Sequence, residues 1–137
     1  MPTLRQTSLP ASGRREAPCT PCRPTLADPG AARRLFDQAE NQLGPLDILV
    51  NNAGVVAGDP IADTTDEVFD AVLAVNLKSP FALIREAARR LREGGRVVNI
   101  STLNTVLVGP RMAPYASSKA ALDCLAAPIT RRRAGNR

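Results

Sequence analysis

Apolar residues in the stretch 28–43 recur every three or four positions, which is the spacing of one helical face. The residues that share this face are Ala32, Leu35, Phe36, Ala39 and Leu43. Asp28 can cap the helix, and Pro29 suits its first turn because proline lacks only an amide that would be unpaired there. Gly44 and Pro45 stop the pattern. The sequence therefore predicts a helix between Asp28 and Gly44.

The next stretch, 46–50 (LDILV), is a short and nearly continuous apolar run. Such a run is typical of a strand that is buried on both faces of a parallel sheet. It ends at Asn51, Asn52, Ala53 and Gly54. Ligands bind at the carboxyl ends of parallel strands, and the two small residues leave room for a flat ligand. An ordinary turn uses the same residue types, so the tetrapeptide alone does not decide between the two.

A second helical pattern follows a loop. Thr64 and Glu67 have the spacing of a capping box, in which each side chain bonds the backbone near the other. Apolar residues then recur at helical spacing at Val68, Phe69, Val72, Leu73 and Leu77, and again at Leu83, Ile84, Ala87, Ala88 and Leu91. Because proline cannot donate a helical hydrogen bond, Pro80 predicts a kink or break near Lys78 and Ser79.

The residues with the clearest chemical potential lie after the second apolar run, 97–100. This run predicts another buried strand, and it ends at two hydroxyl residues, Ser101 and Thr102. Tyr115 then begins a further helical stretch, and Lys119 follows four residues later. Residues four apart share a helical face, so the phenol and the amine are expected to lie side by side.

That pair has a possible use in proton transfer. A free phenol has a pKa of about 10, and a nearby ammonium favours its ionised form. Tyr115 can then exchange a proton with a substrate oxygen near neutral pH. Thr102, thirteen residues before it, can hydrogen-bond the same oxygen. Alone, a tyrosine and a lysine at this spacing more often belong to an ordinary helix surface.

Composition limits the fold and the location of the chain. Its 137 residues suffice for one small domain, and with 44% hydrophobic but only 3% aromatic residues the core must be aliphatic. The absence of any run of about 18 apolar residues predicts no membrane span, and the N-terminus lacks the apolar segment of a secretory signal. We therefore expect a cytoplasmic protein.

The net charge of +5 is concentrated at the two ends. Residues 1–24 carry four arginines and one glutamate, and residues 125–137 carry four arginines and no acid, which leaves −2 for residues 25–124. A nucleic-acid partner would need a basic or aromatic surface in the folded part, which the sequence does not indicate. Nucleic-acid binding is therefore not expected.

Cys19 and Cys22 form C-T-P-C, a spacing found in redox and zinc sites. The chain contains no histidine and no second pair of this kind, so no metal site is predicted. The surrounding segment is rich in proline and arginine and shows neither helical nor strand periodicity. Two incidental thiols in an irregular segment are the simpler interpretation.

Four sequence blocks together resemble the classical short-chain dehydrogenase/reductase family. They are LDILVNNAG at 46–54, VNLKSPF at 75–81, GGRVVNIST at 94–102 and YASSKAAL at 115–122. Their order and spacing also resemble the family, over roughly residues 26–124. The resemblance implies an α/β fold with a doubly wound, Rossmann-like parallel sheet. It also implies hydride transfer between NAD or NADP and a small alcohol or carbonyl substrate.

The resemblance implies a role for each matching polar residue. Tyr115 corresponds to the general acid/base, and Lys119 to the lysine that assists it and holds the nicotinamide ribose. Thr102 occupies the position of the family's serine, with Ser101 as an alternative donor. Asn76 matches the asparagine of a water relay, although an asparagine near a helix kink also bonds local backbone.

Asn51, Ala53 and Gly54 match the loop beside the adenine ribose of the cofactor. The family's glycine-rich T-G-x-x-x-G-x-G motif, however, occurs nowhere among the nine glycines of this chain. We therefore expect a partial fold that lacks the first βαβ unit and the C-terminal strands, as an internal fragment would.

The expected division of the chain is an irregular basic segment at 1–24, a partial core at 25–127 and a basic tail at 128–137. Because the glycine-rich motif is missing, we expect an NAD(P)-dependent oxidoreductase that is impaired by truncation. The alternative is a catalytically inactive fragment. Such a fragment would at most form homo-oligomers through helices 68–92 and 115–127, which match the helices that family dimers pack together.

Overall fold

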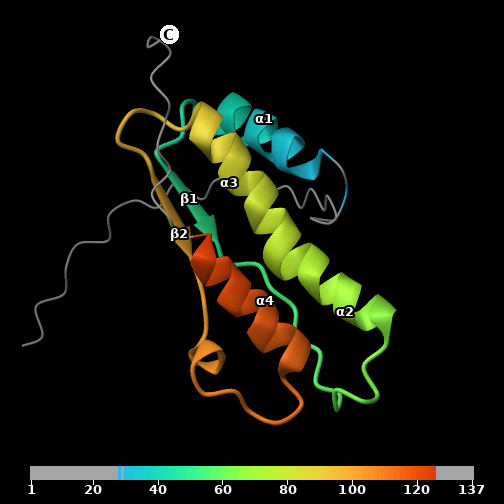
Figure 1. Ribbon diagram of the computed structural model, residues 1–137. Coiled ribbons are helices and arrows are strands. Elements are labelled where there is room, and N and C mark those ends of the chain that lie inside the picture. Colours follow the sequence, from blue (N-terminus) through green and yellow to red (C-terminus); the bar gives the residue numbers. More distant parts are fainter. Residues whose placement is uncertain (1–27, 29, 126–137) are drawn as a thin grey trace, which may run out of the picture.

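The computed structural model describes residues 28 and 30–125 (Figure 1). In chain order the elements are α1 (Ala31–Leu43), β1 (Ile48–Asn51), α2 (Asp66–Leu73), the π-helical segment η1 (Ala74–Lys78), α3 (Ser79–Arg90), β2 (Arg96–Asn99), the 3-10 turn η2 (Leu103–Thr105) and α4 (Ala113–Cys124). The predicted segments 1–24 and 128–137, together with the Cys19 and Cys22 pair, lie outside the described residues.

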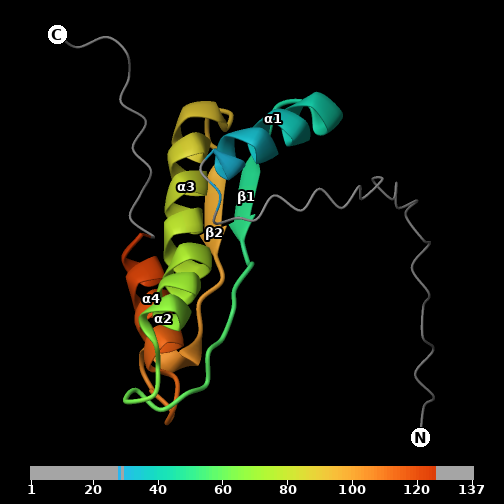
Figure 2. The ribbon, with the colours of Figure 1, turned by 90° about the vertical axis from the view of Figure 1, so that its right-hand side faces the viewer.

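The two strands form a parallel pair in which Leu49 lies opposite Val97 and Val50 opposite Val98. Each predicted apolar run forms a strand, although β1 begins two residues later than expected and includes Asn51. The connection between the strands contains the long helical segment α2–η1–α3, which runs beside them (Figures 1 and 2). This arrangement is the predicted partial, Rossmann-like α/β fold.

The core lies between the strands and two helices. Its buried cluster consists of Phe36 from α1 with Leu83, Ala87 and Leu91 from α3 and its end. Leu49 of β1 and Val97 of β2 pack against this cluster from the sheet. Because the two strand residues are opposite each other in the register, one face of the sheet is covered along its centre.

The opposite face of the sheet is exposed within the described part of the chain. Ile48 and Val50 of β1 are 62% and 54% exposed, and Val98 and Ile100 are each 42% exposed. The prediction that the first strand is buried on both faces is therefore wrong for these residues. The physical reason is that α1 and α3 both pack on the face that carries Leu49.

The start of α1 differs from the prediction, whereas its end agrees. The N-cap is Gly30, with φ 79°, and no side chain among the described residues caps the helix. Asp28 contributes its backbone carbonyl, which accepts a bond of 3.1 Å from the first helical amide. Pro29 lies outside the described residues. Gly44 ends the helix with φ 80°, a conformation that glycine adopts without steric cost.

The cap of α2 lies one residue later than predicted. Thr65, not Thr64, is the N-cap, and its hydroxyl accepts from the amide of Val68 at 3.4 Å. Thr64 instead donates its hydroxyl to the carbonyl of Pro60 at 3.0 Å. The Thr65 hydroxyl also bonds the carboxylate of Glu67, which lowers the pKa of that carboxyl. The local preference for a threonine cap was correct, but the sequence offered two adjacent threonines.

Pro80 produces a change of helical type rather than a break. The amide of Ser79 bonds the carbonyl of Ala74, five residues back, which defines the π-helical segment η1. Since Pro80 has no N–H, the carbonyl of Asn76 lacks the donor that residue i+4 normally supplies. Figure 1 shows α2 and α3 as one continuous rod through this region.

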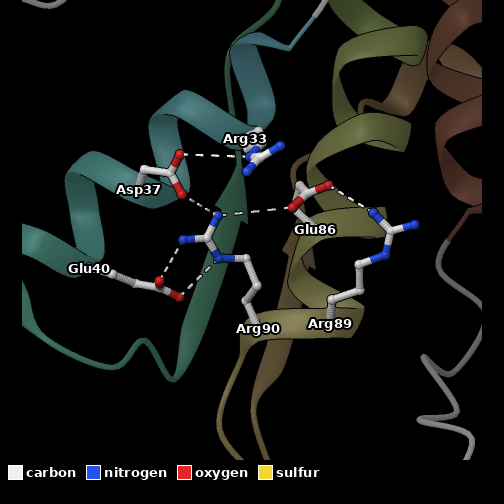
Figure 3. A network of polar contacts seen from close by, with 6 residues as sticks. All are labelled: Arg33, Asp37, Glu40, Glu86, Arg89 and Arg90. Carbon is white, nitrogen blue, oxygen red and sulfur yellow. Dashed lines mark hydrogen bonds and ion pairs between the residues drawn. The ribbon is translucent and has the colours of Figure 1, made fainter.

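Arg90 of α3 ties α1 to the long helix (Figure 3). Its guanidinium lies 2.7 Å from a carboxylate oxygen of Asp37 and bonds both carboxylate oxygens of Glu40. It also stands over the ring of Phe36, 5.5 Å from the centroid. The hydrogen bonds to Glu40, followed by that to Asp37, raise the pKa of Arg90 above its ordinary value. Arg89, by contrast, pairs with Glu86 on its own helix.

We expect Arg90→Met to lower the urea midpoint of the full chain, because it removes the guanidinium whose ion pairs join α3 to α1. Arg89→Met removes the same charge from an exposed position and is the matched control. Unfolding followed by circular dichroism at low and high salt measures both, and the Arg90 effect should shrink as salt screens the ion pairs. Equal midpoints for the two variants would contradict a special role for Arg90.

Thr65→Ala should cost about 1 kcal/mol of unfolding free energy near neutral pH, and Thr64→Ala clearly less. Because the pKa of Glu67 is lowered in the folded state, its stabilising bond exists at high pH and is lost as pH falls through that pKa. The difference between wild type and Thr65→Ala should therefore narrow on acidification. A larger loss from Thr64→Ala would show that the cap had been assigned to the wrong threonine.

Candidate active site

A buried amide, that of Asn76, joins the long helix to the loop after β1. The side chain is 0% exposed and lies in η1. Its Oδ1 accepts from the amide of Val55 at 2.8 Å, and its Nδ2 donates to the carbonyl of the same residue at 2.9 Å. The second proton of Nδ2 goes to Ser118 Oγ of α4 at 3.0 Å. These bonds use both amide protons.

Lys119 of α4 is only 4% exposed, which is unusual for a lysine. Its Nζ donates to the carbonyl of Ile100, just beyond β2, at 2.7 Å. Among the described residues it forms no ion pair. Burial of an ammonium is costly unless acceptors surround it, so this amine can take further acceptors from a ligand.

Gly54 lies where Asn76 and Lys119 meet. A Cβ added to Gly54 would stand 3.4 Å from Oδ1 of Asn76 and 3.5 Å from Nζ of Lys119. The loop therefore passes beside the amine, and the space that a Gly54 side chain would fill stays open. The structure thus brings three of the predicted site residues together, from the loop after β1, from η1 and from α4.

Tyr115 is half-buried in the first turn of α4, one helical turn before Lys119. Within residues 28 and 30–125 its phenol makes no hydrogen bond. Pro114 precedes it at the start of the helix, a position that suits proline. The phenol oxygen therefore retains its full capacity to bond a ligand.

The two candidate hydroxyls after β2 have different surroundings. The oxygen of Ser101 is buried and has no hydrogen-bond partner among the described residues. Thr102 is half-buried, and its hydroxyl accepts from the amide of Asn104 at 3.3 Å, which caps η2. Its own proton stays available for donation. The turn η2, which Thr102 caps, packs against α4, the helix that carries Tyr115.

The predicted cofactor loop also borders a separate pocket of about 130 Å3. Asn51 at the end of β1 lines it together with Asn52 and Ala53 of the following loop, and Val75 and Ser79 line it from the long helical segment. The Nδ2 of Asn51 donates to Oδ1 of Asn99 at 2.8 Å, whereas its own Oδ1 is buried without a partner in the described part. Asn51 therefore lines an apolar pocket, while its own buried Oδ1 has no partner in the described part of the chain.

Sequence reasoning missed two residues that hold this region. Ser118 is 0% exposed, and no sequence pattern distinguishes it from the exposed Ser117. Arg111 has the left-handed φ of 63°, and its Nε donates to the carbonyl of Gly58 at 2.7 Å. This bond joins the loop after β1 to the loop before α4, a contact across 53 positions that no local signal reveals.

Two further observations concern the described residues alone. Each of their helices is too short or too polar to cross a lipid bilayer. The same residues contain no cluster of three side chains of the histidine, cysteine or carboxylate type that could hold a metal ion.

Comparison with known proteins places these features in a family. A sequence model described as short chain dehydrogenase matches residues 7–134. A short-chain type dehydrogenase/reductase of Picea abies is 42% identical over 108 residues, which is 76% of this chain and 40% of the relative. The versicolorin reductase stcU of Emericella nidulans is 43% identical over 106 residues, 74% of this chain and 40% of its own length.

Solved structures give the same result. A dehydrogenase/reductase from Sinorhizobium meliloti superposes with a TM-score of 0.70 at 42% identity and covers 73% of this chain and 40% of its own. The angucycline C-6 ketoreductase LanV, solved with bound NADP, has a TM-score of 0.67 at 37% identity, with 72% and 41% covered. The chain spans about 40% of the length of these relatives. On the family match and this shared fold, the chain belongs to the short chain dehydrogenase family.

Proposed function

We propose that this chain carries the active-site half of an NAD(P)-dependent oxidoreductase that interconverts an alcohol and a carbonyl compound. The observation that carries the proposal is the buried Lys119 amine, which has one carbonyl partner and borders Gly54. An amine in this state can satisfy its remaining protons with the hydroxyls of a ribose. Because Gly54 has no side chain, the space beside the Lys119 amine is open to a ligand there.

In this proposal the bound nicotinamide supplies or accepts the hydride. Tyr115 moves the proton, donating it to a carbonyl oxygen in reduction and removing it from a hydroxyl in oxidation. Lys119, one helical turn away on α4, binds the ribose with the protons that its bond to the Ile100 carbonyl leaves unused. Thr102 donates to the same substrate oxygen and orients it. Asn76 holds the Val55 loop against α4, so that these groups keep their relative positions.

In this proposal the pocket beside Asn51 and Ala53 holds the adenosine part of the same cofactor. Its walls are mostly aliphatic, which suits the flat face of an adenine, and Asn51, Asn52 and Ala53 form one side of it. The structure carries no preference between NAD and NADP. One structural neighbour is a ketoreductase with bound NADP, which makes a ketone with NADPH the first combination to test. We place this reaction in the cytoplasm.

A second candidate function is an inactive chain that forms homo-oligomers through helices 68–92 and 115–127. Phe69 of α2 and Phe81 of α3 are 40% and 51% exposed, which favours a protein contact on this helical layer. We propose no nucleic-acid or membrane partner. Sedimentation of the full chain with NADPH separates the two candidates when the NADPH that sediments with the protein is measured. Only the first candidate requires nicotinamide binding.

The test of the proposed reaction uses the full chain, NADH or NADPH, and α-tetralone as an aromatic ketone probe. Lys119→Met should abolish the change in nicotinamide fluorescence on binding, while Lys78→Met, which removes the same charge from an exposed site, should not. Tyr115→Phe should keep binding and lower turnover about 100- to 10,000-fold. Failure of the wild-type chain to bind either dinucleotide would leave the oligomer-forming chain as the better description.

Gly54→Ala tests the close approach directly. The added methyl would contact Asn76 and Lys119 at ordinary van der Waals distances, so the urea midpoint should change little. Affinity for NADPH should fall, because the methyl occupies the space beside the amine. Gly58→Ala, where a Cβ meets nothing within 4 Å, is the matched control. Unchanged affinity in Gly54→Ala would argue against a cofactor at this position.

A further inference from the structure

Ser118 and its neighbour Ser117 differ in the hydrogen-bond partners of their hydroxyls. Ser117 is exposed, and its Oγ donates to backbone carbonyls of its own helix, Ala113 at 2.7 Å and Pro114 at 3.1 Å. Ser118 is 0% exposed and bonds two different segments. Its Oγ lies 2.7 Å from the carbonyl of Tyr115 and 3.0 Å from Nδ2 of Asn76.

The direction of each bond follows from the chemistry of the groups. The amide nitrogen of Asn76 can only donate, so Ser118 Oγ accepts there. The single hydroxyl proton is then left for the carbonyl of Tyr115, which can only accept. Flipping the Asn76 amide would place oxygen against both Ser118 Oγ and the Val55 carbonyl, and nitrogen against the Val55 amide. One orientation of Asn76 is therefore strongly preferred.

The same hydroxyl thus links the two parts of the site. On one side it orients Asn76, whose Oδ1 and Nδ2 hold the amide and carbonyl of Val55. On the other side it holds the backbone of Tyr115 in the first turn of α4. Because Asn76 holds the Val55 loop, a shift at Ser118 would move that loop relative to the phenol, whereas the Lys119 amine stays bonded to the Ile100 carbonyl.

We propose that Ser118 is a positioning residue, which sets the geometry between the Asn76–Val55 clamp and the Tyr115–Lys119 pair. Its catalytic consequence rests on the proposed oxidoreductase function. Its geometric role does not, because the hydrogen bonds that define it involve only residues of this chain. The geometric role of Ser118 and its catalytic consequence can therefore be measured separately.

The geometric role is tested by amide hydrogen exchange of Val55, followed by NMR on the full chain. Ser118→Ala leaves Asn76 one partner short and should accelerate this exchange about three- to tenfold, the effect of one net hydrogen bond. Ser118→Cys keeps nearly the same size with only weak hydrogen bonding and should act in the same direction, which decides the matter if the alanine variant fails to fold. Ser117→Ala should leave the exchange unchanged.

The catalytic consequence is tested with NADPH and α-tetralone. Ser118→Ala should lower kcat at least severalfold while the dissociation constant of NADPH changes little, since the Lys119 bond to Ile100 does not pass through Ser118. Faster Val55 exchange with unchanged kcat would reduce Ser118 to a structural residue and overturn the proposal. Unchanged exchange, or equal acceleration in Ser117→Ala, would overturn it as well. If wild type binds no dinucleotide, the proposed function fails, and the exchange data still decide the role of Ser118.

Discussion

The amide of Asn76 is the interaction on which the arrangement of this site depends. It is fully buried and bonds the loop after β1 on one side and α4 on the other. A buried amide is costly when its groups lack partners, so Val55 and Ser118 are held to the positions that satisfy it. Three segments separated by 21 and 42 positions are thereby brought to one place. The amine of Lys119 lies at the same place, beside Gly54.

The position of that amide depends on an irregularity in the helix that carries it. The bond from Ser79 to Ala74 spans five residues instead of four, and the donor missing at Pro80 makes a regular helix unfavourable there. π-Helical segments of this kind often occur at functional sites, because they redirect side chains without ending the helix. Here the segment turns Asn76 toward α4 while α3 continues to pack against the strands.

The sheet itself supports the site from one side only. Leu49 and Val97 pack into the helical core, whereas Ile48, Val50 and Val98 leave an apolar face exposed. Burying an aliphatic side chain of this size fully is worth about 1.5–3 kcal/mol, so much of the stabilisation that this sheet could provide is unused in the described residues. On the covered face, the ion pairs of Arg90 also connect α3 to α1.

Local sequence patterns determined the long helices, the two strands and the placement of Tyr115 and Lys119 one turn apart on a single helix. Each of these features depends on residues within a few turns of a helix or along one strand. The same patterns did not decide which of two adjacent threonines caps α2, nor which of two adjacent serines is buried. They also overestimated the burial of β1, since a strand cannot specify what covers its second face. The partners of Asn76 and of Lys119 were decided only by tertiary structure. They lie 19 to 42 positions away, and such contacts exist only once the strands and helices have packed together.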